Sequence, residues 1–137
     1  LRPRPTVLTP HPLEAGRLLG CTAAQVQADR LRASRELVQR FGCVVVLKGS
    51  GTLIAGPGRT PLLNPTGNAR LATAGTGDVL AGLLASRLAA TPDPFDAAAA
   101  AVYEHGRLAD DWSPRQALTA SLLSQAVAPH REPSAPP

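Results

Sequence analysis

Hydrophobic residues follow two different spacings along this chain, and the alternation between them predicts an α/β protein. Short apolar runs, typical of strands, cover residues 7–9, 43–47, 52–55 and 61–63. The run at 43–47 is rich in β-branched residues and has no polar position, as expected for a strand buried on both faces of a mostly parallel sheet. Glycine-rich turns after this run indicate that short antiparallel strands follow it.

Between and after these strands, apolar residues recur at helical spacing. Proline, serine, threonine or aspartate stands at the beginning of these segments, and glycine follows some of their ends, as is typical of helices. The helices expected on this basis cover residues 12–19, 22–42 with an interruption at 28–29 left open, 79–90, 93–110 and 113–128. Residues 129–137 are proline-rich with nothing to bury, so we expect a disordered tail after a domain that spans 1–128.

Composition narrows the classes of protein to which the chain can belong. Of its 137 residues, 44% are hydrophobic but only 3% are aromatic, so alanine, leucine and valine must build the core. The net charge of +4 comes from scattered basic residues without interleaved aromatic side chains, which argues against nucleic-acid binding. Cys21 and Cys43 lack metal-binding spacing and are expected in the core. With no apolar run of membrane length and no evident signal peptide, we expect a cytoplasmic protein without a membrane partner.

The order of the elements predicts the later half of a larger α/β domain. The chain contains no methionine, so Leu1 is not an initiator residue, and the first strand begins almost at once. A sheet with only two parallel candidates, residues 7–9 and 43–47, would leave strand edges and apolar surface exposed. We therefore expect either an upstream segment of the same protein or a homo-oligomer to cover them.

The segment 71–78, Leu-Ala-Thr-Ala-Gly-Thr-Gly-Asp, carries the strongest chemical signal. It precedes a predicted helix, so we expect an anion hole at a helix N-terminus, formed by the backbone N–H groups of Ala74, Gly75, Thr76 and Gly77. A carboxylate would repel a resting anion, and we interpret Asp78 as a base that acts on a substrate hydroxyl while these N–H groups stabilise a transferred phosphoryl group. The alternative is a tight turn with Asp78 as an N-cap.

Two other segments follow predicted strands and could hold a ligand. Lys48 is the only lysine in a chain that otherwise uses arginine, which favours a need for a compact point charge. Gly49 and Gly51 would let a nucleotide approach the backbone closely, although a simple hairpin is the alternative. His11 lies between two prolines at the carboxyl end of the first strand, where open α/β sheets bind ligands. Its alternative is a loop histidine without a role.

Together these segments resemble the ADP- or ATP-dependent NAD(P)H-hydrate dehydratase family. The resemblance rests on ordered stretches: Thr-Pro-His-Pro at 9–12, Val-Leu-Lys-Gly-Ser-Gly-Thr at 46–52, Asn-Pro-Thr-Gly-Asn at 64–68, Ala-Thr-Ala-Gly-Thr-Gly-Asp-Val-Leu-Ala-Gly at 72–82, and Val-Tyr with His-Gly at 102–106. It implies a ribokinase-like three-layer fold and an enzyme that repairs hydrated NADH and NADPH. In that reaction a nucleotide phosphorylates the hydroxyl at ring carbon six, and phosphate then leaves.

The family's contacts, carried over to this chain, imply that His11 and Asp78 bind the hydrated cofactor. The adenine nucleotide, ADP or ATP, would be held by a mostly glycine-rich set: Lys48, Gly49, Ser50, Gly51, Thr52 and Gly77. Mg²⁺ is expected to accompany the phosphates, but no carboxylate cluster marks its ligands, which stay unknown. The chain departs from the family at Leu13, where glycine is usual, and at 107–110, and neither departure removes an expected contact.

Two other functions stay open. A Gly-x-Gly-Asp sequence before a helix serves small-alcohol kinases of this fold generally, such as hydroxymethylpyrimidine or hydroxyethylthiazole kinases. The turns at 9–12 and 64–68 argue against that assignment. The chain could also be a fragment without catalytic activity that only binds nucleotide or mediates assembly.

Overall fold

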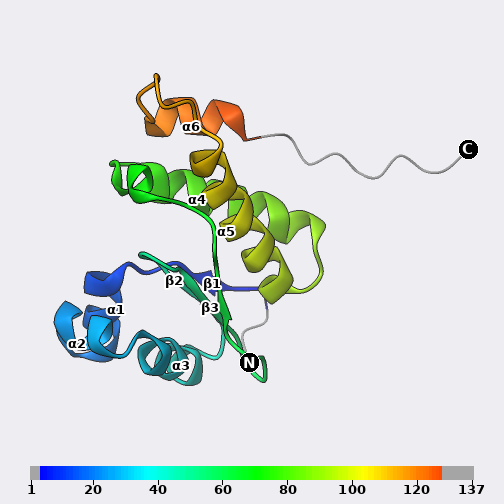
Figure 1. Ribbon diagram of the computed structural model, residues 1–137. Helices are drawn as coiled ribbons and strands as arrows, with labels where there is room; N and C mark the ends of the chain where they lie inside the picture. Colours follow the sequence, from blue (N-terminus) through cyan, green and yellow to red (C-terminus); the bar gives the residue numbers. More distant parts are fainter. Residues whose placement is uncertain (1–3, 128–137) are drawn as a thin grey trace, which may run out of the picture.

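The computed structural model describes residues 4–127, which form a four-stranded sheet with helices on both faces. The strands are β1 (Val7–Leu8), β2 (Val44–Leu47), β3 (Leu53–Ala55) and β4 (Leu62–Leu63). The helices are α1 (Pro12–Leu19), α2 (Ala23–Ala28), α3 (Arg30–Phe41), α4 (Thr76–Ala90), α5 (Pro94–Asp110) and α6 (Ala120–Ala126), and a short 3-10 helix, η1, covers Ala69–Ala72. Figure 1 shows α1, α2 and α3 on one side of the sheet and α4 and α5 on the other, with α6 outside that pair.

The sheet combines one parallel pair with two antiparallel pairs, in the order β1-β2-β3-β4. β1 pairs in parallel with β2, so that Val7 lies opposite Val44, whereas β2 with β3 and β3 with β4 are antiparallel. The parallel pair and the antiparallel strands after it were both expected from the sequence, and both are confirmed. The carboxyl ends of β1 and β2 therefore lie side by side, which places the loops that follow them next to one another.

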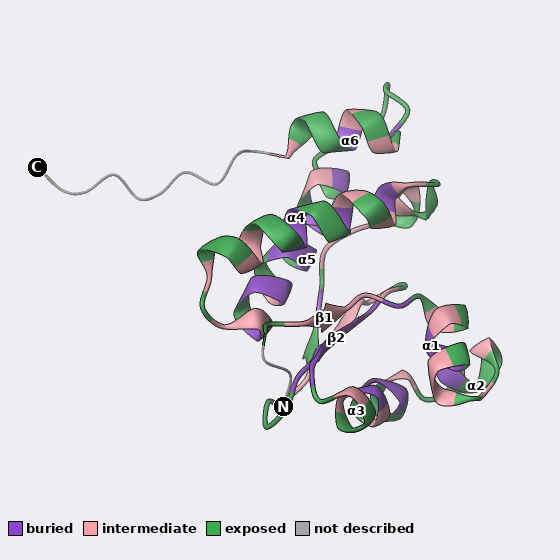
Figure 2. Cartoon of the chain, turned by 180° about the vertical axis from the view of Figure 1, so that it is seen from behind, coloured by how far each residue is buried: buried purple, intermediate pink, exposed green. Residues whose placement is uncertain are grey.

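The central strand β2 is buried on both faces, as predicted. Val44 and Val46 pack against α4 and α5, in a cluster that includes Leu80, Leu83, Leu84, Phe95, Ala98, Ala101 and Val102. Val45 and Leu47 point the other way and pack with Ala15, Val26, Ala33 and Leu37 from the first three helices. Figure 2 shows buried residues gathered along the strands and on the sides of helices that face them.

The helix boundaries agree with the sequence except at α4, which begins at Thr76 rather than at residue 79, and at the last helix. The interruption left open at 28–29 is real, because Asp29 ends α2 and its carboxylate accepts the N–H of Arg32 to begin α3. The prediction that a helix begins at a Ser113 cap was wrong. The Ser113 hydroxyl is used in a local turn with the N–H of Arg115, and α6 begins instead after Thr119, whose side chain caps it.

The C-terminal residues and the segment 69–72 differ in how far the structure tests them. The last helix was expected to end near residue 128, and 129–137 were expected to be disordered; residues 128–137 lie outside the described part. The 3-10 helix η1 was not expected. Asn68 explains it, because its side-chain oxygen accepts the N–H of Arg70 and begins the turn.

One prediction follows from the sheet edges. No residue within 4–127 pairs with the outer edge of β1, and at the other edge Leu62 and Leu63 are 44% and 66% exposed. Open edges and exposed leucines favour association, so this chain alone should self-associate and bind a hydrophobic dye, as measured by light scattering and dye fluorescence. Leu63→Lys should reduce dye binding at β4 only. A compact monomer that binds no dye would contradict the prediction.

Candidate nucleotide and phosphoryl-transfer site

The loops after β1 and β2 meet the N-terminus of α4 around one pocket of about 690 Å³. A backbone hydrogen bond from Lys48 N–H to the Pro10 carbonyl, 2.9 Å, joins the first two loops. The pocket is lined by residues from segments that sequence analysis singled out, including His11, Lys48, Gly49, Ser50, Gly51, Thr52, Thr66, Gly67, Asn68, Thr76 and Gly77. All the residues expected to hold the nucleotide are therefore brought together.

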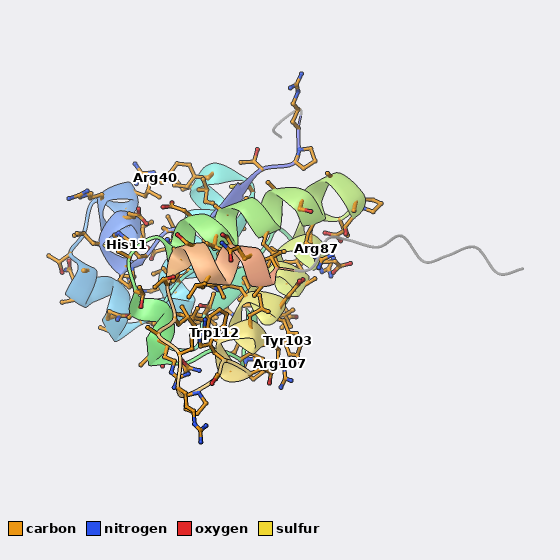
Figure 3. All side chains as sticks on the ribbon, turned by 90° about the horizontal axis from the view of Figure 1, so that it is seen from above. His11, Arg40, Arg87, Tyr103, Arg107 and Trp112 are labelled. Carbon is orange, nitrogen blue, oxygen red and sulfur yellow. The ribbon has the colours of Figure 1, made fainter. Side chains whose placement is uncertain are left out.

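His11 has a structural task as well as a place at the pocket. It is the N-cap of α1: its Nδ1 accepts the N–H of Glu14, and the Glu14 carboxylate accepts the N–H of His11 at 2.7 Å. The hydrogen bond from the His11 N–H lowers the pKa of Glu14, and the nearby Lys48 ammonium adds to the effect. Figure 3 shows His11 at the blue end of the molecule that holds α1. His11 thus has a structural role at the start of α1, and its contact with a ligand stays a prediction.

Lys48 reaches across the pocket towards α4. Its Nζ lies 3.9 Å from a carboxylate oxygen of Glu14, and a methyl group at Gly77 would lie 3.2 Å from the same nitrogen. The ammonium is therefore close to the first turn of α4, where unsatisfied N–H groups favour anions. An anion between Lys48 and Gly77 would be held by a positive charge on one side and a helix N-terminus on the other.

The N-terminus of α4 is only partly the anion hole that the sequence predicts. Gly75 is the N-cap, with φ of 84°, and α4 begins at Thr76. The Thr76 N–H is already bonded to the Thr73 carbonyl at 3.3 Å, so it differs from the free donor that was expected. Within residues 4–127 the N–H groups of Ala74, Gly75 and Gly77 have no hydrogen-bond acceptor, and they remain available to a ligand.

Asp78 is not in the same pocket as the other candidates. It is exposed, lies in the first turn of α4 rather than at the N-cap, and lines a second cavity of about 570 Å³ between α4 and α6. Gly75 also lines this second cavity, and Gly77 lines the first. The two cavities therefore lie on either side of the start of α4, and the chain from Gly75 to Asp78 separates them.

The turn at 64–68 is held in place by α5. The Thr66 hydroxyl donates to the Tyr103 carbonyl at 2.9 Å, and Asp110 accepts the Gly67 N–H at 2.9 Å and an Asn68 side-chain N–H at 3.1 Å. Gly106 is required here, because a Cβ at this position would lie 2.1 Å from the Thr66 hydroxyl oxygen. Figure 3 shows Tyr103 on the yellow α5. The sequence analysis gave Asp110 no role, and no motif around it indicates its contacts with Gly67 and Asn68.

His105 is a second residue to which the sequence analysis gave no role. It is buried, lines the pocket, and its Nε2 lies 2.9 Å from the carbonyl of Thr76. A carbonyl only accepts, so Nε2 carries a proton and donates to it. Burial lowers the pKa of His105 and nearby Lys48 lowers it further, whereas the bond to Thr76 opposes both. A neutral imidazole on α5 thus supports the first turn of α4.

The described residues offer no metal site of their own. No group of three or more histidine, cysteine, aspartate or glutamate side chains within 4–127 is placed to hold an ion. Mg²⁺ is commonly held by one or two carboxylates with substrate phosphates and water, so this part of the chain fits an ion that arrives with a nucleotide rather than a protein cage. None of the helices in 4–127 is long and apolar enough to cross a membrane.

Comparison with known proteins identifies the family. A family model described as NAD(P)H-hydrate dehydratase matches residues 1–129. The chain belongs to the NAD(P)H-hydrate dehydratase family. It is 50% identical over 123 residues to the ADP-dependent (S)-NAD(P)H-hydrate dehydratase of Neisseria meningitidis, a match that covers 90% of this chain and 42% of that protein.

Solved structures of the family confirm the ribokinase-like fold. The crystal structure of the ADP/ATP-dependent NAD(P)H-hydrate dehydratase from Bacillus subtilis, co-crystallized with ATP/Mg²⁺, matches at a TM-score of 0.80 and 40% identity over 88% of this chain and 45% of that one. A ribokinase-like superfamily protein from Enterococcus faecalis matches at 0.76 and 34% identity over 88% and 41%. The chain therefore spans less than half the length of these relatives.

His105 gives a prediction about pH. Because its pKa in the folded protein lies below the ordinary 6.5, the unfolded chain binds the proton more readily between these two values. The free energy of unfolding should therefore fall as the pH falls below about 6.5. His105→Gln keeps an N–H for the Thr76 carbonyl but does not titrate, so denaturant unfolding should show a smaller loss for it between neutral pH and about pH 5. Equal losses in both proteins would contradict the assignment.

Proposed function

We propose that this chain carries the nucleotide-binding and phosphoryl-transfer half of an NAD(P)H-hydrate dehydratase, which restores hydrated NADH or NADPH at the expense of ADP or ATP. One observation carries the proposal: the Lys48 ammonium faces the N-terminus of α4 at Gly77 across a pocket lined by the glycine loop 48–52. This arrangement fits the terminal phosphates of a nucleotide. The names of the relatives, which include ADP and ATP/Mg²⁺, support the choice of ligand.

The chemistry we assign to this chain has two steps. The hydroxyl at ring carbon six attacks the terminal phosphorus of the nucleotide, its proton passes to the Asp78 carboxylate, and the bond from phosphorus to the leaving nucleotide oxygen breaks. Phosphate then leaves carbon six while the neighbouring ring carbon loses a proton, so that the carbon–carbon double bond re-forms. The products are the restored dihydronicotinamide, phosphate and the shortened nucleotide.

The two cavities at the start of α4 are consistent with separate binding of the nucleotide and of the hydrated ring. We place the nucleotide in the cavity of Lys48 and Gly77, and the hydrated ring on the side of Asp78. Transfer would occur past the N–H groups of Gly75 and Gly77, where negative charge that develops on the phosphoryl oxygens is stabilised. Mg²⁺, when it binds with the nucleotide, would neutralise part of the phosphate charge. His11, which lines the first cavity, would contact a part of the hydrated cofactor other than the ring.

The site of action and the state of assembly belong to the same proposal. We place the protein in the cytoplasm, where NADH and NADPH are used. Because the chain spans 42% of its Neisseria relative, we also propose that full activity requires the open edge of β1 to be covered, by a second copy or by another segment of the same protein.

The direct test is an assay with hydrated NADH and either ADP or ATP, in which the absorbance of restored NADH is followed. Recovery that depends on nucleotide supports the proposal. Nucleotide binding without recovery, with the β1 edge covered, would favour a non-catalytic fragment instead. Phosphorylation of hydroxymethylpyrimidine or hydroxyethylthiazole, without recovery of NADH, would favour the small-alcohol kinases.

Asp78→Asn should lower turnover by at least about a hundredfold, the usual contribution of a general base, while nucleotide affinity stays nearly unchanged because the N–H groups of the turn remain. Turnover and calorimetric affinity for ADP measure the two effects. Asp111→Asn is the matched control, since Asp111 is an exposed carboxylate that pairs with Arg107 at the end of α5. Near-normal turnover of the Asp78 variant would remove this residue from the mechanism.

Lys48→Ala should mainly weaken nucleotide binding, by about tenfold to a hundredfold, because it removes one charged partner of the phosphates. Lys48→Arg keeps the charge but replaces a compact ammonium with a broad planar group close to Gly77, so it should restore only part of the affinity. Both are measured by calorimetry with ADP and with ATP. Unchanged nucleotide affinity in Lys48→Ala would favour the alternative, in which Lys48 is only a surface residue of a simple hairpin.

A further inference from the structure

Arg30, at the first position of α3, makes the most extensive set of side-chain hydrogen bonds to any loop of the pocket. Its Nη1 donates to the Ser50 carbonyl at 3.0 Å. Its Nη2 donates to Leu47 at 3.0 Å, and is shared with Gly51 at 3.2 Å and Lys48 at 3.4 Å. One guanidinium thus gathers four carbonyl oxygens from the end of β2 and the turn that follows. No sequence motif around Arg30 predicts these four hydrogen bonds.

The orientation of these carbonyls determines where the N–H groups of the loop point. All peptide bonds in the described part are trans, so the carbonyl of one residue and the N–H of the next point in opposite directions. With the carbonyls of Lys48, Ser50 and Gly51 turned towards Arg30, the N–H groups of Gly49, Gly51 and Thr52 are directed away from α3. Successive N–H groups that point to one side of a turn form an anion-binding concavity.

The loop lies between Arg30 and the pocket. Residues 48–52 line the pocket, whereas Arg30 does not, and Arg30 is partly buried behind them. Within 4–127 the N–H groups of Gly49 and Gly51 have no acceptor. A Cβ at Gly49 would lie 2.5 Å from Arg30 Nη1, so a side chain at this position would displace the guanidinium. Gly49 therefore allows Arg30 to pack against one side of the loop and a ligand to approach the other side.

We infer that Arg30 is a positioning residue for the nucleotide: by holding the carbonyls of Leu47, Lys48, Ser50 and Gly51 on one side, it presents N–H groups of the loop to the phosphates on the other. The inference rests on the proposed nucleotide site. It depends on the planar fork of the guanidinium, since a lysine would bring the same charge but cannot reach four carbonyls from one plane. Charge and geometry can therefore be separated by substitution.

The test compares Arg30→Lys, which keeps the charge, with Arg30→Gln, which does not. Both should weaken ADP binding about tenfold or more by calorimetry, performed well below the unfolding temperature, and both should speed amide hydrogen exchange at Lys48, whose N–H is bonded to the Pro10 carbonyl. Arg35→Lys and Arg35→Gln are the matched controls, because Arg35 is an exposed arginine of the same helix. They should change neither quantity. A role in stability alone would lower the melting temperature without changing ADP affinity in the folded protein.

The outcomes distinguish this inference from the proposed function. ADP affinity in Arg30→Lys within about twofold of the parent would overturn the inference and leave the function standing. If the parent chain itself does not bind ADP, the proposed function fails, and the inference about Arg30 fails with it, whatever the exchange measurement shows. If Arg30→Gln does not fold, the more conservative lysine variant carries the comparison.

Discussion

The pocket depends on the parallel pairing of β1 with β2. A parallel pair ends both strands at the same edge of a sheet, and the bond from Lys48 N–H to the Pro10 carbonyl extends the pairing beyond the strands themselves. This places the turn of His11 beside the loop of Lys48, although 36 residues, which include three helices and β2, separate them in the chain. Both strands are short, so the burial of β2 on its two faces supplies most of what holds this edge together.

From this edge the site is assembled by contacts between elements rather than within them. α3 reaches the glycine loop through Arg30, α1 reaches Lys48 through Glu14, and α5 reaches the start of α4 through His105. Arg30 therefore holds the glycine loop from the side away from the pocket, whereas His105, which lines the pocket, holds the first turn of α4.

Much of the fold could be predicted from the sequence, because β2 is a continuous apolar run and helix caps such as Thr22 and Asp93 act locally. The members of the pocket were also predictable, since they lie in glycine-rich segments after strands. Ser113 was misleading, because a serine can begin a helix or close a turn, and only tertiary packing around Leu118 and Leu123 decides where α6 begins. Nor does a sequence show that Asp78 faces a different cavity from Lys48, or that Arg30 lies behind the loop, because both depend on how helices pack.

The absence of a side chain at Gly106 affects the size of ligand that the pocket can accept. Here the backbone of α5 touches the turn at 64–68 with nothing between them, and that turn forms one wall of the pocket. Any larger residue would push the wall forwards, towards the ligand, from a position on the far side of it. The width of the pocket is thus set partly by α5 at Gly106, a position that a bound molecule does not touch. A substitution there can change which ligands fit, just as a substitution in the pocket lining can.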